Sequence, residues 1–252
     1  MNRNGDKFAP PENGRADRSG HEISVAEAPT IGSLPVTETE AVLFSLARML
    51  EQRDSHTAGH CERLAYASVA LGAAMRLDSE SLLSLYVGGY LHDVGKIGIP
   101  DSVLFKPGKL NEEEWLIMRA HPVRGEEICR PLISLSRVLP LIRHHHERWD
   151  GTGYPDGLRG QKIPVLARVL QVVDIYDALT NPRPYKQAFT GQRALEILKQ
   201  ESARGWRDRE IAELFIRLQQ ANLSASPLDI GPEKAPATLL TSLRNLQSQL
   251  TH

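Results

Sequence analysis

The chain has 252 residues, of which 41% are hydrophobic and 24% charged, and its 30 basic and 31 acidic side chains give a formal charge of -1. This composition is typical of a folded protein with one sizeable core and argues against an intrinsically disordered chain. The charge balance argues against binding of nucleic acid through bulk positive charge. No apolar run is long enough to span a membrane and the N-terminus lacks a signal peptide, so we expect a cytoplasmic protein.

The cysteines give no sign of a metal ribbon or of disulfides. Cys61 and Cys129 are far apart in the sequence, and neither belongs to a C-x-x-C motif. That spacing fits neither a zinc ribbon nor a disulfide framework. We therefore expect both thiols to be small buried residues of the core.

The sequence divides into three predicted segments. Residues 1–36 are rich in Pro, Gly, Asn and charge and lack periodicity, which indicates a disordered leader. Residues 37–223 carry the helical patterns and form the main domain. Residues 224–252 contain a loop and a short helix with leucines at near-heptad spacing. That helix either packs on the domain or forms the seam of a homodimer, and its short length favours packing.

Apolar residues at helical spacing predict helices in the first half of the chain, and no segment alternates as a strand does. The first predicted helix spans residues 37–53. The second carries His60 on its buried stripe, in line with leucines three and four residues apart. Asp78 or Ser79 caps the third helix, which is expected to continue through the sequence LHDVGK until Gly95 stops it.

The second half of the chain is also predicted to be helical, which makes the fold class all-α. Asn111 begins a capping box, and the helix after it is expected to end at His121, directly before Pro122. His145 continues the apolar stripe of a later helix. Several glycines then interrupt regular structure until Pro164 opens another helix.

Seven polar residues fall on the buried stripes or at the ends of these helices. A single histidine of this kind is most often an ordinary hydrogen-bonded residue. Seven positions in one helical core are hard to explain in that way, because each neutral imidazole needs a partner and an unpaired buried carboxylate is costly. Two first-row metal ions would supply the partners. The seven residues are His60, His92, Asp93, His121, His145, His146 and Asp174.

Asp93 is the expected centre of this set. It follows His92 directly, so the two side chains reach one cluster from adjacent directions, and the carboxylate can bridge two ions. Two ions held in this way can activate water for attack on phosphorus. Lys96 lies on the same predicted helical face as His92 and is either a stabiliser of negative charge on a phosphate or an ordinary solvated lysine. Asp93 and Lys96 are the candidate catalytic residues.

Four motifs in order resemble one known family. YLHDVGKIGIPD, MRAHPVRGEEI, HHERWDGTGYPDGLRG and ARVLQVVDIYDALTNPRPYK look like the HD-GYP group of HD-superfamily metal-dependent phosphohydrolases. The resemblance covers about residues 40–200 and is specific because all motifs are present; the HD doublet alone would be weak. It implies an HD-domain helical bundle with a C-terminal helical extension, and the activity of a bacterial cyclic di-GMP phosphodiesterase.

The resemblance also assigns roles to individual residues. All seven positions above match the family's metal ligands, which implies two divalent metal ions, with iron or manganese favoured. Lys96 matches a lysine near the attacked phosphate, and Arg183 and Lys186 of RPYK match a pair that grips phosphate. Tyr154 lies in the Gly-Tyr-Pro loop of residues 153–155 and either stacks on a purine or packs the loop. His144, the first histidine of the triplet, matches no ligand.

One departure from the family bears on the number of ions. Members with three metals carry a Glu four residues before the first ligand histidine, and this chain has His56 there. If the helix begins early, His56 and His60 share a face and an imidazole replaces the carboxylate. If Thr57 caps the helix, His56 lies outside it and two ions are expected, which is the interpretation that we favour.

Several alternatives stay open at the level of sequence. The leading hypothesis is hydrolysis of cyclic di-GMP to pGpG and onward to GMP; a rival is an HD phosphohydrolase for another cyclic dinucleotide or nucleotide. A third is a degenerate module that binds GGDEF-domain or other signalling proteins through the Gly-Tyr-Pro loop, which the complete ligand set disfavours. Glu147 and Asp150 are either acceptors that orient the metal histidines or ordinary loop charges.

Overall fold

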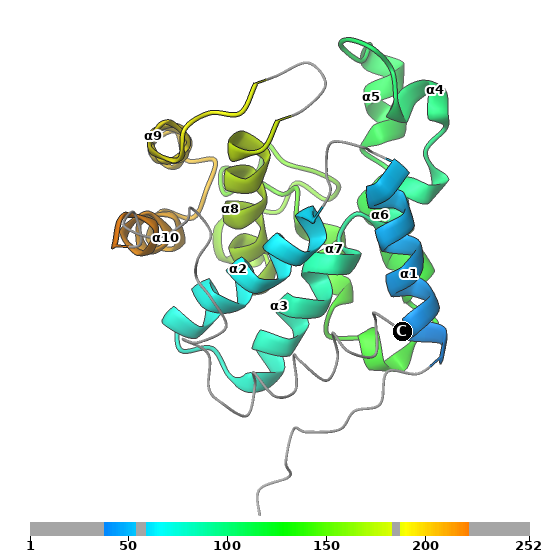
Figure 1. Ribbon diagram of the computed structural model, residues 1–252, viewed down its shortest axis with the longest axis horizontal. Helices are drawn as coiled ribbons and strands as arrows, with labels where there is room; N and C mark the ends of the chain where they lie inside the picture. The colour runs from blue at the N-terminus through cyan, green and yellow to red at the C-terminus, as the bar shows by residue number, and fades with distance from the viewer. Residues whose placement is uncertain (1–37, 54–58, 183–186, 222–252) are drawn as a thin grey trace, which may run out of the picture. The chain divides into compact units, whose positions relative to one another are not determined.

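The structure is a computed structural model that describes residues 38–53, 59–182 and 187–221. Within these ranges it consists of helices joined by loops and contains no strand, so the prediction of an all-α fold is confirmed (Figure 1). No helix among the described residues is long and apolar enough to cross a bilayer. The predicted leader and C-terminal helix, together with His56, Arg183 and Lys186, lie outside the described ranges.

The described residues form ten α-helices and three 3-10 turns, and the turns are labelled η. In chain order they are α1 (Glu38–Arg53), α2 (His60–Ala74), α3 (Ser79–Leu91), η1 (Val94–Gly98), α4 (Asp101–Leu104), α5 (Glu112–Met118), α6 (His121–Cys129), η2 (Ile133–Leu135), α7 (Leu139–His144), η3 (Gly160–Lys162), α8 (Val165–Thr180), α9 (Gly191–Ala203) and α10 (Arg209–Ala221). The helix predicted over residues 37–53 is therefore confirmed.

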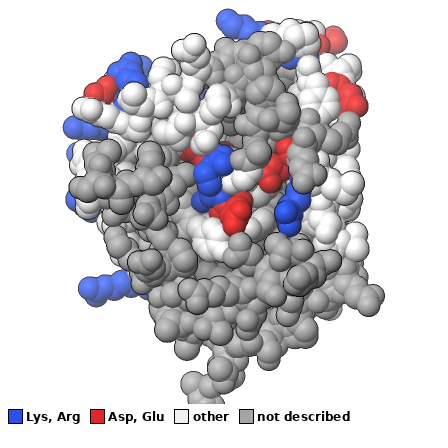
Figure 2. Space-filling view, in the orientation of Figure 1, with Lys and Arg blue, Asp and Glu red and all other residues white. Residues whose placement is uncertain are grey.

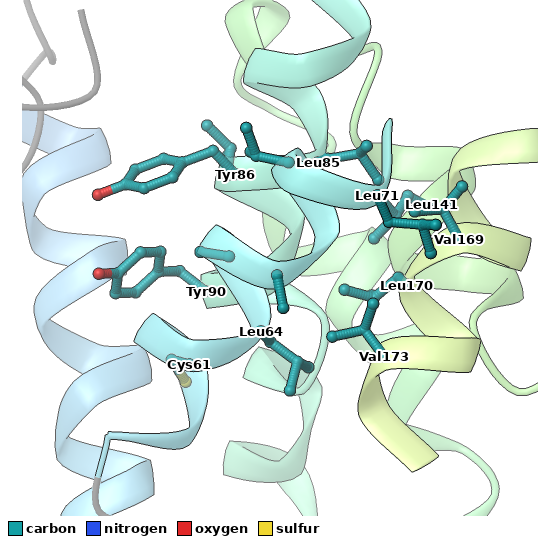
Figure 3. Close-up of a cluster of buried hydrophobic side chains, with 14 of the residues drawn as sticks. Cys61, Leu64, Leu71, Leu85, Tyr86, Tyr90, Leu141, Val169, Leu170 and Val173 are labelled. Carbon is teal, nitrogen blue, oxygen red and sulfur yellow. The ribbon is translucent and has the colours of Figure 1, made fainter. Parts of the chain in front are cut away.

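The core lies where α2 packs against α3 and α8 (Figure 3). Leu64 and Leu71 of α2, Leu85 of α3 and Leu170 of α8 are completely buried. Each such side chain contributes about 1.5–3 kcal/mol through removal of apolar surface from water. Helices α9 and α10 pack on each other and on α8, so they form the C-terminal extension expected of this fold. The core holds the three helices that carry or adjoin most of the candidate ligands.

Both cysteines are buried and free, as predicted. Cys61 is 5% exposed at the start of α2, and Cys129 is fully buried at the end of α6. Burial raises the pKa of each thiol, because the apolar surroundings disfavour the thiolate. The two residues therefore act as small core side chains and not as reactive groups.

The described part of α2 begins at one of the candidate ligands. The helix begins at His60, and the residue before it, Gly59, has a left-handed backbone with a φ of 73°. A left-handed residue interrupts a right-handed helix, so α2 does not extend back past His60. His56 itself lies outside the described residues, so its relation to His60 stays a prediction.

The segment after α3 differs from the prediction. Helix α3 ends at Leu91 rather than continuing through the sequence LHDVGK, and Lys96 lies in the separate turn η1. Lys96 and His92 thus do not share a helical face. The early end is caused by packing, since η1 lies directly against α6 and a continuous helix would carry the chain past it. Asp78 caps α3 by accepting from the amide of Ser81, as one of the two alternatives predicted.

His121 begins a helix instead of ending one. The capping box of Asn111 and Glu114 is present, but α5 ends at Met118 and α6 starts at His121. Pro122 is compatible with this arrangement, because the first turn of a helix does not need a proline amide as donor. The prediction of the helix boundary was wrong, although the placement of His121 at an element end holds.

Gly95 permits the close approach of η1 to α6, which leads to a first prediction. A methyl group at this position would collide with the carbonyl oxygen of His121 and the amide nitrogen of Gly125. Because both atoms are backbone, relief requires movement of a helix, and G95A should lower the free energy of unfolding by about 1–3 kcal/mol. Chemical denaturation of the two proteins measures the difference.

Gly98 of the same turn supplies the matched control. It is exposed, and a methyl group there would meet only the flexible side chain of Arg124, at 3.0 Å. G98A should therefore change the free energy of unfolding by no more than about 0.5 kcal/mol. Equal losses in the two variants would contradict the steric account of Gly95.

Candidate metal centre

The orientation of four imidazoles is fixed by hydrogen bonds at Nδ1. Three of these bonds run to a backbone carbonyl three residues earlier, at the C-terminal end of a helix where carbonyls lack helical partners. A carbonyl can only accept, so Nδ1 carries the proton and the neutral ring keeps its lone pair at Nε2. The pairs are His92 with Gly89 at 3.1 Å, His121 with Met118 at 2.8 Å, His145 with Ile142 at 2.7 Å, and His60 with the carboxylate of Asp177 at 2.7 Å.

The free Nε2 atoms converge on Asp93. Nε2 of His121 lies 3.2 Å from Oδ1 of Asp93 and 3.3 Å from Nε2 of His145. On the other side, Nε2 of His92 lies 3.3 Å from Oδ2 of the same carboxylate. Two nitrogen lone pairs that face each other beside a carboxylate repel, since none of the three groups offers a proton. A cation between them removes the repulsion.

Asp93 belongs to two groups of ligand atoms. One group consists of His60, His92 and Asp93, and the other of Asp93, His121, His145 and His146, each with its ligand atoms within 4.8 Å of one another. Asp174 lies beside the first group, with Oδ1 at 3.7 Å from Nε2 of His60. All seven residues predicted from the sequence are thus brought together, with Asp93 between two sets of imidazoles.

The residues fit bound metal ions. Nε2 of His92 and Oδ1 of Asp93 are buried and have no hydrogen-bond partner among the described residues. Unpaired buried polar atoms are expensive, and two on neighbouring ligand residues indicate that a bound group completes the site. Imidazole nitrogens with carboxylate oxygens are a donor set that suits first-row transition metals.

The ionisation states of Asp93, His145 and His146 also suit metal binding. Burial disfavours the charged form of Asp93, but Lys96 and the surrounding imidazoles outweigh it and hold the pKa of this carboxyl well below its usual value. Burial, followed by the neighbouring histidines, lowers the pKa of His145 well below the usual value, and burial with His121 does the same for the pKa of His146. An ionised carboxylate and neutral imidazoles are the forms that bind metals.

Asp177 is a functional residue that the sequence-based prediction of ligands missed. Its carboxylate is 2% exposed, accepts from Nδ1 of His60, and is held by Arg63 with Nε at 2.6 Å. Hydrogen bonding to His60 and Arg63 outweighs burial and lowers the pKa of Asp177. Asp177, held in place by Arg63, therefore orients His60 from outside the cluster. The sequence offered a signal, since Asp174 and Asp177 are one helical turn apart on α8 and Arg63 follows His60 by three residues.

Lys96 contacts Asp93 directly. Its Nζ lies 2.5 Å from Oδ2 of Asp93, a spacing of three residues that suits the tight turn η1. Both residues line a cavity of about 220 Å³ that also reaches His60 and Asp174. The ammonium is thus placed beside the carboxylate that joins the two groups of ligands.

The loop after the histidine triplet is held by Glu147. This fully buried carboxylate accepts from the amides of Asp156 at 2.7 Å and Leu158 at 3.0 Å, and it contacts no metal-ligand histidine. Asp150 caps Thr152 within the same loop. The interpretation of Glu147 and Asp150 as acceptors that orient the metal histidines is therefore wrong. Their carboxylates shape the loop.

Tyr154 and His144 have different surroundings. The ring of Tyr154 stacks on that of His146, with centroids 4.8 Å apart, and so forms a wall of the cluster. His144 points toward the loop instead, with Nδ1 at 3.4 Å from Asp156, and belongs to neither group around Asp93. This placement agrees with the motif match, in which only the second and third histidines are ligands.

A second cavity also borders the ligands. It measures about 390 Å³ and shares His146, Asp174 and Ile175 with the first cavity, so both adjoin the cluster. Figure 2 shows acidic and basic side chains close together in a recess on the face of the molecule drawn there.

Comparison with known proteins places this site in a family. The HD domain model matches residues 45–211. The chain belongs to the HD-domain family. Solved structures with the same fold as this HD domain include a cyclic GMP-AMP specific phosphodiesterase from Vibrio cholerae, with a TM-score of 0.59 and 17% identity over 83% of this chain and 59% of that one. An HDG"Y"P protein from Bdellovibrio bacteriovorus has a TM-score of 0.53 and 21% identity over 64% of this chain and 51% of that one.

Curated relatives of this HD domain are phosphodiesterases by name. A cyclic di-GMP phosphodiesterase response regulator from Xanthomonas campestris is 42% identical over 64% of this chain and 43% of its own length. A 3'3'-cGAMP-specific phosphodiesterase from Vibrio cholerae is 33% identical over 68% of this chain and 38% of its own. The resemblance to the HD-GYP group is confirmed, while the chain spans less than half the length of these two relatives.

The position of Asp177 in this HD domain gives a second prediction. D177N keeps the size of the side chain but replaces the anion that fixes His60 and Arg63 by a neutral amide. Loss of such an outer partner lowers metal affinity by roughly 10–100-fold. Competition between the protein and a chelator for the metal measures the affinity, and D150N, which alters a carboxylate of the loop only, is the matched control. Unchanged affinity in D177N would show that His60 needs no such support.

Proposed function

We propose that this HD domain is a metal-dependent phosphodiesterase that hydrolyses cyclic di-GMP to pGpG and, in a second step, to GMP. The observation that carries the proposal is the convergence of the Nε2 atoms of His92, His121 and His145 on the carboxylate of Asp93. Such a centre suits two adjacent cations, and two cations suit attack of water on a phosphodiester. The names of the relatives in Xanthomonas campestris and Vibrio cholerae support the substrate class.

The residues have separate tasks in this proposal. His60, His92, Asp93 and Asp174 would hold one ion, and Asp93, His121, His145 and His146 the other, with Asp93 common to both. When bound, the ions supply Lewis-acid activation of the phosphate and a lowered pKa of water. Lys96, which lines the same cavity as Asp93, places its ammonium beside the phosphate oxygens and stabilises the charge that develops there.

The proposal also includes the metal cofactor and the binding partners. We expect two ions rather than three, with iron or manganese as the metal, because the candidate ligands form two groups around Asp93 and their donor atoms suit first-row transition metals. Tyr154, the wall beside His146, would contact the substrate, and the Gly-Tyr-Pro loop would be the surface for GGDEF-domain or other signalling proteins. A cytoplasmic location and a homodimer remain parts of the proposal.

A second candidate substrate is 3'3'-cGAMP. Relatives from Vibrio cholerae that are specific for this dinucleotide by name are 31–35% identical to the chain, close to the 37% of a cyclic di-GMP phosphodiesterase from the same organism. Overall identity therefore does not decide which of the two dinucleotides is the substrate. The residues that contact the bases must decide the preference.

The histidine triplet tests the proposed function directly. Metal-reconstituted protein should convert cyclic di-GMP to pGpG, and chromatography of the products measures this conversion. H145A should lower turnover by more than about a hundredfold and reduce bound metal, because removal of a ligand costs more than loss of its outer partner. H144A, one residue away and directed toward the loop, should keep most of both. The reverse ranking would contradict the assignment of the ligands, and no turnover by the parent protein would contradict the function.

Substitution of Arg183 tests whether the protein binds a second phosphate of the substrate. We propose that its guanidinium makes two charge-assisted hydrogen bonds to the phosphate that is not attacked, with Lys186 as a nearby charge. Such a bond is worth about 1.5–3 kcal/mol, so R183A should lower kcat/KM for cyclic di-GMP by roughly ten- to a hundredfold with metal content intact. The loss should be smaller on bis-p-nitrophenyl phosphate, which has one phosphate. Equal losses on both compounds would assign Arg183 to the reaction centre or the fold.

A further inference from the structure

The larger cavity beside the metal ligands has an unusual lining. Three arginines, Arg119, Arg148 and Arg207, face the space of about 390 Å³ next to His146 and Asp174. A volume of this size lies in the range of small-molecule sites and exceeds what one phosphate group needs. The carboxylate among the described lining residues, Asp174, belongs to the metal centre.

Arg148 lies over an indole ring and forms no ion pair within the described residues. Its guanidinium lies 4.3 Å from the centroid of the Trp206 ring, and the backbone of Trp206 is tied to the same loop by a hydrogen bond from the amide of Trp149 at 3.1 Å. No carboxylate within the described residues forms an ion pair with Arg148. Stacking on an indole fixes the plane of the guanidinium while leaving its N–H edge available.

Arg119 stands at the aromatic wall of the same cavity. Its guanidinium lies 5.3 Å from the ring centroid of Tyr154 and 5.7 Å from that of Trp115, and it too has no ion pair with a described carboxylate. Trp115 is 46% exposed although it is a large aromatic side chain. Arg207 is buried and pairs with Glu201 at 3.0 Å. The cavity thus combines planar surfaces with side chains that donate hydrogen bonds and cannot accept them.

We propose that this cavity binds a guanine base of the dinucleotide, with Arg148 donating to O6 and N7 of the base and Trp115 and Arg119 covering its faces. The inference rests on the proposed function and deepens it. Guanine presents two acceptors side by side on this edge, whereas adenine presents the acceptor N7 beside the donor N6. The two N–H groups of an arginine therefore pair with O6 and N7 of guanine. On adenine, one of them would face the donor N6. Because the cavity shares His146 and Asp174 with the metal centre, a base placed here leaves its adjoining phosphate next to the ligands.

The test replaces Arg148 by glutamine. Glutamine both donates and accepts, and it is the side chain that pairs with N6 and N7 of adenine. The ratio of kcat/KM for cyclic di-GMP to that for cyclic di-AMP should therefore fall by roughly ten- to a hundredfold in metal-loaded R148Q relative to the parent. A ratio of two substrates cancels general effects of the substitution on folding or on the metals.

Arg204 gives a closely matched control. Its guanidinium lies over the same Trp206 ring, at 5.3 Å, but it is exposed and does not line the cavity. R204Q should leave the substrate ratio unchanged. An equal loss on both dinucleotides in R148Q would assign Arg148 to a phosphate or to the loop, and unchanged kinetics would show that the cavity holds no base. Either result overturns the proposal.

A binding measurement separates this inference from the proposed function. Calorimetric titration of the metal-loaded protein with GMP and with AMP should show tighter binding of GMP, and R148Q should lose that difference. Since the two nucleotides carry the same phosphate, the difference reports the base alone. If the parent protein cleaved no dinucleotide but kept the preference for GMP, the function would fail and the base site would stand. Equal binding of GMP and AMP by the parent would overturn the base site.

Discussion

The site depends on the proton at Nδ1 of its histidines. His92, His121 and His145 each donate to a carbonyl three residues earlier, at the end of a helix where that carbonyl lacks a helical donor. One hydrogen bond therefore completes the helix end and turns Nε2 inward. The metal centre thus consists of helix ends brought to one point. His60 stands apart, because its acceptor is not a nearby carbonyl but the carboxylate of Asp177, which belongs to α8.

Bringing helix ends together requires backbone to approach backbone. Glycine occurs where it does so: Gly89 of α3 lies against Ala65 of α2, and Gly95 lies against His121 and Gly125. In each case a methyl group would meet backbone atoms, so the spacing of α2, α3, η1 and α6 depends on these residues. Stability and ligand geometry are coupled through these contacts, since a helix displaced to relieve a collision carries its histidine with it.

The histidine triplet connects the candidate metal centre to the larger of the two cavities. Gln171 of α8 donates to the carbonyls of His145 and Glu147, while the Glu147 carboxylate binds the amides of the following loop. The loop returns Tyr154 onto His146. A short segment therefore sets both the ligands and the aromatic wall of the neighbouring cavity. This explains why imidazoles and glycines are adjacent in the sequence. The imidazoles of His145 and His146 face the cluster around Asp93, and the glycines let the loop fold back over them.

The sequence by itself determined the all-α class and pointed to the seven residues that the structure brings together, because helical periodicity is local and the motifs of the HD-GYP group are distinctive. Tertiary structure decided the rest. Asp177 reaches His60 across 117 residues of sequence, and α3 ends at Leu91 because η1 packs on α6. The arginines of the cavity come from three separate segments, after α5, after α7 and before α10. Periodicity describes which face of a helix is apolar, but it contains no information on which distant helix will cover that face.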